Sequence, residues 1–195
     1  MPEKILNNAD LEKIVDTNDD WITTRTGIKE RRILDKGIGT SYMAIRAANT
    51  IIKNKKLDPT QIDLVIVATI TPDMHATATA AYVASEIGAS NAFGFDISAA
   101  CSGFLYGLST ASAFIESGRY KKIILIGADK MSSIVDYSDR NTCIIFGDGA
   151  GAVLLEPDYE GYGVQDEYLR SNGSNRNLLR IEAGGSQTPT TKESV

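Results

Sequence analysis

Cys101 is the residue whose type and setting best suit covalent chemistry in this 195-residue sequence. It stands between a predicted buried strand and a predicted helix, where unpaired backbone N–H groups and the helix dipole favour the nucleophilic thiolate. Because the neighbouring side chains are small, a substrate carbonyl could approach closely and backbone N–H groups could stabilise an oxyanion. The alternative is a small cysteine that fills the core. The small neighbours are Ala99, Ala100, Ser102 and Gly103.

The second cysteine and the single histidine are weaker candidates for catalysis. Cys143 lies in the apolar run TCIIF, which predicts an inert core residue. His75 would have to serve any cysteine–histidine pair confined to this sequence, but we favour a turn or solvent role for it. The two cysteines form no CxxC pair, so neither a disulfide framework nor a metal site is indicated. A reducing, cytoplasmic setting is expected.

A group of basic residues accompanies the only tryptophan, in the segment 21–32, WITTRTGIKERR. An exposed aromatic ring beside arginines can sandwich an adenine and pair with phosphates, which suits a nucleotide-bearing carrier such as coenzyme A. The alternative is a solvated basic strand whose tryptophan belongs to the core. The glycine-rich run 146–152, FGDGAGA, lacks both the GxGxxG fingerprint and the Walker lysine, and it predicts a tight turn into a strand.

Short apolar runs alternate with helical patterns along the sequence, which predicts a layered α/β fold. The run LVIVATI is continuously apolar, as in a strand of a parallel sheet that is covered on both faces. Asn8 is a predicted N-cap of the first helix. The predicted strands are 64–70, 92–97, 122–129 and 150–155, and the predicted helices are 9–15, 19–25, 40–53, 76–87 and 102–117.

Charge and hydropathy exclude several classes of protein. Twenty Lys and Arg against 25 Asp and Glu give a net charge of −5, so no general positive field attracts nucleic acid or an anionic membrane. The charged start of the sequence has no apolar signal-peptide region. The uncharged stretch 97–115 approaches membrane-spanning length, but its serines and glycines favour a buried central helix. Residues 161–195 are polar, glycine-rich and strand-like.

Three separated motifs make the sequence similar to one known family. They are residues 8–32, the stretch DISAACSGFLYGLS around Cys101, and DRNTCIIFGDGAGAVLL from Asp139. In this order they resemble β-ketoacyl-acyl-carrier-protein synthase III, whereas AACSGF alone would indicate only the wider thiolase-like group. The stretch 172–195 is also similar to this family.

The resemblance implies a thiolase-like, layered αβαβα fold and a homodimeric, cytoplasmic acyltransferase of fatty-acid biosynthesis. Such an enzyme transfers an acyl group from acyl-CoA to Cys101, and then condenses it with malonyl-acyl carrier protein. No cofactor or metal is implied, because acyl-CoA is a substrate. By the same matching, Trp21 and Arg140 would flank the adenine of coenzyme A. Thr17 and Arg25 would bind its adenine or phosphate portion. Ile145 and Leu179 would line the channel or acyl pocket.

The sequence also departs from the family pattern. The family completes its site with a histidine and an asparagine in its second half, and His75 does not align with that histidine. The family's first strand has no match ahead of Met1, so residues 1–160 are predicted to form an incomplete amino-terminal core and 161–195 the start of a connecting segment. The family's FPS loop reads Ala76-Thr77-Ala78 here, which leaves the starter length open. Alone, the chain is expected to carry out at most the acyl transfer.

Two alternative functions remain open at this point. One is a thiolase-like starter synthase that uses another acceptor, as in polyketide or alkylquinolone synthesis. The other is a non-catalytic fragment that serves in dimerisation or in another interaction. Neither nucleic acid nor a membrane is an expected partner.

Overall fold

The computed structural model describes residues 1–192 of the chain. It divides into a first compact unit, Met1–Gln165, and a second that begins at Asp166. The first unit contains all the helices and strands of the described chain, apart from one short 3₁₀ turn at Gly173–Asn175. The prediction that residues 161–195 are strand-like was therefore wrong for residues 161–192. The polar side chains in this segment form no apolar face that a sheet could bury. The role of the second unit as a connecting segment stays a prediction.

A four-stranded mixed sheet lies at the centre of the first unit, in the order β4-β3-β5-β6. Strand β3 runs parallel to both β4 and β5, and β6 runs antiparallel to β5. Strand β3 and the first part of β5 are fully buried, as their continuous apolar runs predicted. The strands are β3 (Leu64–Ala68), β4 (Phe93–Ile97), β5 (Ile123–Lys130) and β6 (Asp148–Leu155).

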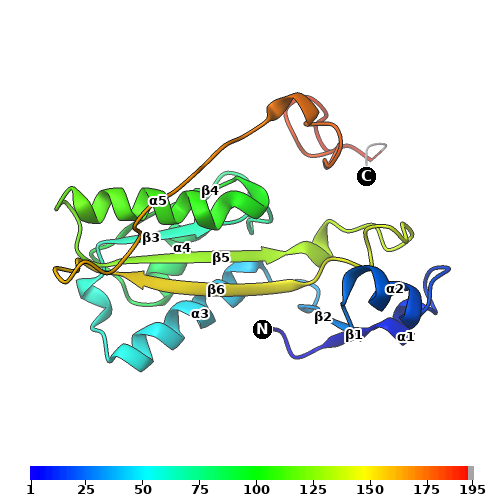
Figure 1. The fold of residues 1–195 in the computed structure, drawn as a ribbon, viewed down its shortest axis with the longest axis horizontal. Coiled ribbons are helices and arrows are strands. Elements are labelled where there is room, and N and C mark those ends of the chain that lie inside the picture. The colour runs from blue at the N-terminus through cyan, green and yellow to red at the C-terminus, as the bar shows by residue number, and fades with distance from the viewer. Residues whose placement is uncertain (193–195) are drawn as a thin grey trace. The chain divides into compact units, whose positions relative to one another are not determined.

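Helices cover both faces of this sheet (Figure 1). Alternate side chains of β3 and β5 point to opposite faces, as the two-residue period of a strand requires. On one face, Val65 and Val67 pack with α3 (Thr40–Lys55) and α4 (Thr79–Glu86). On the other face, Leu64 and Ile66 pack with α5 (Gly103–Glu116). The helix–sheet–helix arrangement confirms the predicted α/β class and forms three layers of the expected five.

A third cluster joins the start of the chain to the loop before β6. Here β1 (Ile5–Asn7) pairs antiparallel with β2 (Glu30–Arg32). The helices α1 (Asn8–Leu11) and α2 (Asp19–Thr26) lie between them in the sequence. Buried Leu11 and Ile22 pack with Cys143 and Ile144 from the distant loop. This cluster fixes the segment that carries Trp21.

The structure corrects several predicted element boundaries. The first helix is capped by Asn7 rather than Asn8 and spans one turn instead of reaching Val15. Helix α4 starts three residues later than expected. Strand β6 begins at Asp148 instead of residue 150, so Gly149, which was predicted to belong to the turn, lies inside the strand. Strands β4 and β6 are the sheet edges and are only partly buried, although both were expected to be buried, because an edge strand lacks one neighbour.

The described chain contains no helix of the length and apolar character that a membrane span requires. The uncharged stretch considered above forms the end of β4, a short turn and most of α5.

Candidate functional site

Cys101 lies in a 3₁₀ turn, Ala100–Ser102, that joins the end of β4 to the start of α5. Its side chain is exposed, so the core-filling alternative is wrong. The preceding Ala100 has φ of +45°, a left-handed conformation that costs a residue with a Cβ atom about 1–3 kcal/mol. The tight strand-to-helix turn holds the thiol at the surface, beside the amino-terminal end of α5, where a nucleophile can be reached.

The thiol borders a hollow of about 480 Å³. Phe104 of α5 and Asp129 of β5 contribute to its wall, and much of the remaining wall consists of glycine and alanine. Small residues here leave the backbone of β5 and β6 accessible beside the sulfur. The close approach of a substrate carbonyl to Cys101, predicted from its small neighbours, stays a prediction. The glycines that line the hollow are Gly127, Gly147, Gly149 and Gly151.

Trp21 carries two stacked guanidinium groups. The Cζ atom of Arg25 lies 4.4 Å from the indole centroid, and that of Arg140 lies 4.5 Å from it. Arg25 reaches the ring from within α2, whereas Arg140 comes from the loop before β6 and also pairs with Asp16 at 3.5 Å. Arg140 contacts the ring directly, so an adenine can lie between Trp21 and Arg140 only after that guanidinium moves away.

The hydroxyl oxygen of Thr17 is buried and has no hydrogen-bond partner. It lies just before Asn18, whose side chain caps α2 by accepting from the Trp21 N–H at 2.7 Å. A buried hydroxyl without a partner is uncommon, because desolvation costs free energy that a hydrogen bond normally offsets. Thr17 thus carries an unused hydrogen-bonding group in the segment that leads into α2 and Trp21.

Ile145 is 46% exposed and lines a different hollow, of about 720 Å³. That hollow and the one at Cys101 share Met1, Gly147 and Gly149. Ile145 follows Ile144, which packs in the same cluster as Trp21. The loop before β6 therefore connects the tryptophan region to the neighbourhood of the thiol.

Not every basic residue of the 21–32 segment is available to a ligand. Arg31 is buried, and its Nε donates to the Ile144 carbonyl at 2.8 Å while its Nη1 donates to Asn8. Burial lowers the pKa of Arg31. Asn8 in turn donates to the Ile28 carbonyl at 2.9 Å. Arg31 thus joins the start of the chain to the loop before β6, a structural role that its sequence neighbourhood did not reveal.

Cys143 is fully buried, as predicted, and burial raises the pKa of its thiol. His75 is exposed in the loop before α4, which agrees with the turn role favoured from the sequence. Leu179 is 75% exposed and belongs to the second unit, and its part in the acyl pocket stays a prediction. In residues 1–192, no group of three or more His, Cys, Asp or Glu side chains is placed to hold a metal ion.

Two carboxylates that were not predicted as site residues lie close to these hollows. Asp148 is 3% exposed and accepts from the Leu34 N–H at 2.7 Å and from the Ser132 N–H at 2.8 Å. Asp129 accepts from three donors in residues 69–71. No local pattern indicates these contacts, because the donors lie up to 114 positions away along the chain.

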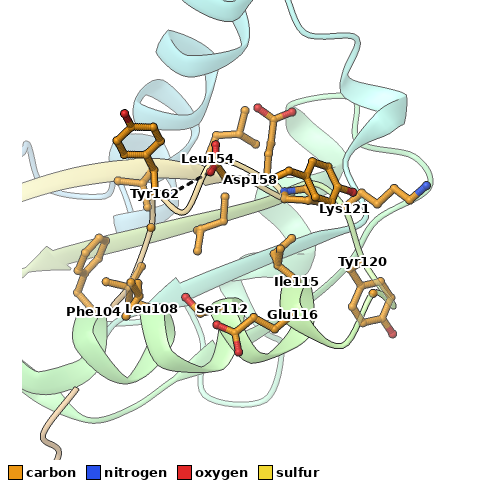
Figure 2. A pocket seen from close by; sticks show the side chains of 18 residues that line it. Phe104, Leu108, Ser112, Ile115, Glu116, Tyr120, Lys121, Leu154, Asp158 and Tyr162 are labelled. Carbon is orange, nitrogen blue, oxygen red and sulfur yellow. Dashed lines mark hydrogen bonds between the residues drawn. The ribbon is translucent and has the colours of Figure 1, made fainter. Parts of the chain in front are cut away.

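A larger hollow, of about 800 Å³, lies along α5 (Figure 2), and Phe104 lines both this hollow and the one at Cys101. Leu108, Ser112 and Glu116 line it from the helix, and Asp158 and Tyr162 line it from the segment after β6. None of the predicted site residues borders this hollow.

Comparison with known proteins identifies the relatives of this chain. The family model described as 3-Oxoacyl-[acyl-carrier-protein (ACP)] synthase III matches residues 95–173. A relative from Chlorobaculum tepidum named Beta-ketoacyl-[acyl-carrier-protein] synthase III is 57% identical over 198 residues, which cover 100% of this chain and 60% of the relative. The chain thus spans three fifths of that relative's length.

Solved structures agree with this comparison. A 3-oxoacyl-[acyl-carrier-protein] synthase III from Aquifex aeolicus VF5 is 51% identical, with a TM-score of 0.78 over 81% of this chain and 51% of its own. The priming beta-ketosynthase from the R1128 polyketide biosynthetic pathway is 37% identical, with the same TM-score of 0.78 over 80% of this chain and 47% of its own. These similarities confirm both the thiolase-like fold and the family resemblance drawn from the motifs.

Proposed function

We propose, from the similarity of the chain in sequence and in fold to β-ketoacyl-acyl-carrier-protein synthase III proteins, that Cys101 accepts an acyl group from acyl-CoA. The observation that carries the proposal is the exposed thiol in a strained strand-to-helix turn beside a small-residue hollow. The whole protein would then condense the bound acyl group with malonyl-acyl carrier protein, and so begin fatty-acid synthesis.

In the first step, the Cys101 thiolate attacks the thioester carbonyl of acyl-CoA. A new C–S bond forms to Cys101, the C–S bond to coenzyme A breaks, and coenzyme A leaves as its thiolate. A covalent thioester divides acyl transfer and carbon–carbon bond formation into two easier steps. The thiol lies immediately before the first turn of α5.

The Trp21–arginine stack supplies the proposed binding site for the adenine and phosphates of coenzyme A. Two guanidinium groups can pair with phosphates, and the indole face can stack on adenine once Arg140 moves. The unpartnered hydroxyl of Thr17 is buried, so it would bond to the same part of the ligand only after the groups that cover it move. Ile145 would then contact the narrow chain of coenzyme A on its way to Cys101.

We assign only the acylation step to residues 1–195. Decarboxylation of the malonyl group needs the histidine and asparagine that the family resemblance implies, and these are expected in the second half of the family's fold, beyond this range. No bound cofactor is proposed, because coenzyme A enters and leaves as part of a substrate. A homodimer in the cytoplasm is proposed from the same resemblance, and the partly exposed edge strand β4 offers unpaired backbone groups for a second copy.

The direct test is the intact mass of the denatured chain after incubation with acetyl-CoA. We expect an acetyl-sized increment that maps to Cys101, that is lost in Cys101→Ala and that persists in Cys143→Ala. An unmodified Cys101 under these conditions would contradict the proposal and favour a non-catalytic interaction fragment.

A starter synthase that uses another acceptor is the second candidate, favoured by the similarity to the polyketide priming enzyme. Both candidates share the acylation of Cys101 and differ in the acceptor. The acetylated whole protein should transfer its acyl group to malonyl-acyl carrier protein for fatty-acid synthesis. Transfer to a small free acceptor, with none to the carrier protein, would favour the second candidate.

A further inference from the structure

Asp129 joins the end of β5 to the residues that follow β3. Its Oδ1 accepts from the Thr69 hydroxyl at 3.0 Å, from the Ile70 N–H at 2.9 Å and from the Thr71 hydroxyl at 3.1 Å. Backbone pairing between β3 and β5 extends to Ala68 and Gly127. The carboxylate therefore continues the connection between the two strands beyond the last residue of β3.

Thr71 is held from two further directions. Its hydroxyl accepts from the Lys130 N–H at 2.8 Å, and its carbonyl accepts from the Thr40 hydroxyl at 2.6 Å. Thr69 and Thr71 are both buried. A buried network in which each of these groups is hydrogen-bonded is rigid, because breaking one bond leaves a desolvated donor or acceptor.

The same segment supports the Cys101 turn at both of its ends. Before the turn, the Ile97 carbonyl at the end of β4 accepts from the Thr69 N–H at 3.1 Å. After the turn, Gly103 packs so closely on Ala68 that an added Cβ would lie 3.2 Å from the Ala68 Cβ. The turn between them contains the strained Ala100, and such a conformation persists only where the surrounding structure enforces it.

We propose that Asp129 is a positioning residue for Cys101. Its carboxylate fixes residues 69–71. This segment holds Ile97 before the Cys101 turn and, through the adjoining Ala68, Gly103 after it. The proposal rests on the acyl transfer proposed above. Asp129 also borders the hollow at Cys101, so a displaced carboxylate changes both the support of the turn and one wall of the hollow. A thiol misplaced by about 1 Å can lose about 100-fold in rate.

Asp63 provides a matched control at the opposite end of the same two strands. Its carboxylate accepts from the Lys121 N–H at 2.7 Å and from the Lys122 N–H at 2.9 Å, just before β5 begins. Asp63→Ala and Asp129→Ala each remove a carboxylate that joins β3 to β5. Only Asp129→Ala acts on the end that carries the Cys101 turn. Asp129→Asn keeps an oxygen that can accept these hydrogen bonds and removes the charge.

The first readout is single-turnover acetylation of Cys101 in the full chain. We expect Asp129→Ala to lower the rate constant at saturating acetyl-CoA by about 100-fold. Its half-saturating acetyl-CoA concentration should stay close to that of the unchanged chain, since the Trp21–arginine stack is intact. Asp129→Asn should recover most of the rate, and Asp63→Ala should leave it near the original value. Equal rate losses in Asp129→Ala and Asp63→Ala would overturn the proposal.

The second readout is deuterium uptake by the backbone of residues 97–103, which needs no acyl donor. It should be faster in Asp129→Ala than in Asp63→Ala, and equal uptake would also overturn the proposal. If the unchanged chain accepts no acetyl group, the proposed function fails, whereas the uptake comparison still decides whether Asp129 fixes the turn. The two failures are thus distinguishable.

Discussion

Replacement of Trp21 by alanine tests whether the indole binds the nucleotide of acyl-CoA. In the free chain the ring carries two guanidinium groups, at 4.4 Å and 4.5 Å. Each exposed contact of this kind contributes about 0.5–1 kcal/mol. A base stacked on an aromatic side chain contributes about 1–3 kcal/mol. An adenine that displaces Arg140 therefore gains one stack and loses one cation–π contact.

The stack contributes about 2 kcal/mol to binding, and the displaced contact costs about 1 kcal/mol. Trp21→Ala should therefore weaken the binding of acetyl-CoA by about 1 kcal/mol. Such a loss raises the half-saturating acetyl-CoA concentration about fivefold. The rate constant at saturation should not change, because the adenine lies away from the bond that breaks and contributes equally to ground state and transition state. Trp21→Phe keeps an aromatic face and should recover part of the affinity.

The assay compares acetyl-CoA with the acetyl thioester of N-acetylcysteamine, which lacks the adenine and phosphates. Acetylation is followed by intact mass as a function of donor concentration. Trp21→Ala should weaken use of acetyl-CoA and leave use of the short thioester unchanged. An equal effect on both donors would refute the assignment and would show that Trp21 acts through the fold, since its ring also packs on the buried cluster around Ile22.

Three further predictions concern stability and are measured by urea unfolding. Asp148→Ala leaves buried donors unpaired and should lower the unfolding free energy by about 3 kcal/mol, clearly more than the exposed Asp136→Ala does. Equal effects of the two substitutions would contradict the structural role of Asp148. Arg31→Met removes the donors to a buried carbonyl and should lower the unfolding free energy by about 2–4 kcal/mol. Arg32→Ala, which removes a surface ion pair, should lower it by less than about 1 kcal/mol, and the reverse order would exclude the buried network. Burial raises the pKa of the Cys143 thiol in the folded chain, so the thiol ionises at lower pH in the unfolded chain. The contribution of Cys143 to the free energy of unfolding is therefore complete below the unfolded pKa and declines as pH rises above about 8.5. The difference in unfolding free energy between the unchanged chain and Cys143→Ala should shrink from pH 8 to pH 10 on that account, and a constant difference would argue against the raised pKa.

The sequence predicted the secondary structure well where local signals were strong. The apolar runs of β3 and β5 needed no partner to be recognised, and Asn18 and Gly27 delimit α2 as cap residues do. The first helix was placed wrongly, because Asn7 and Asn8 are both possible caps. The structure uses Asn7 as the cap and directs the amide of Asn8 toward Asp19 and Ile28.

Some residues of the candidate site were predicted from the sequence and others were missed, for a similar reason. Cys101 was predicted as the nucleophile from its small neighbours, which leave space for a substrate, and the structure places its thiol at the surface. Asp129 and Asp148 could not be found in this way, since their partners come from other strands and loops. The contact of Arg140 with Trp21 likewise joins residues more than a hundred positions apart, and no local pattern encodes it.

The sequence alone indicated the class of fold and the similarity to the synthase III proteins, because these depend on local patterns of apolar, small and capping residues. The reactivity of Cys101 stays a prediction. Only the tertiary structure decided which strands form the sheet edges, which arginine is buried and which remain free to stack, and how a carboxylate of β5 supports the turn of Cys101. These properties arise from contacts between segments that are distant in the sequence. Burial and hydrogen bonding at such contacts depend on packing in three dimensions, which the order of residues along one segment does not specify.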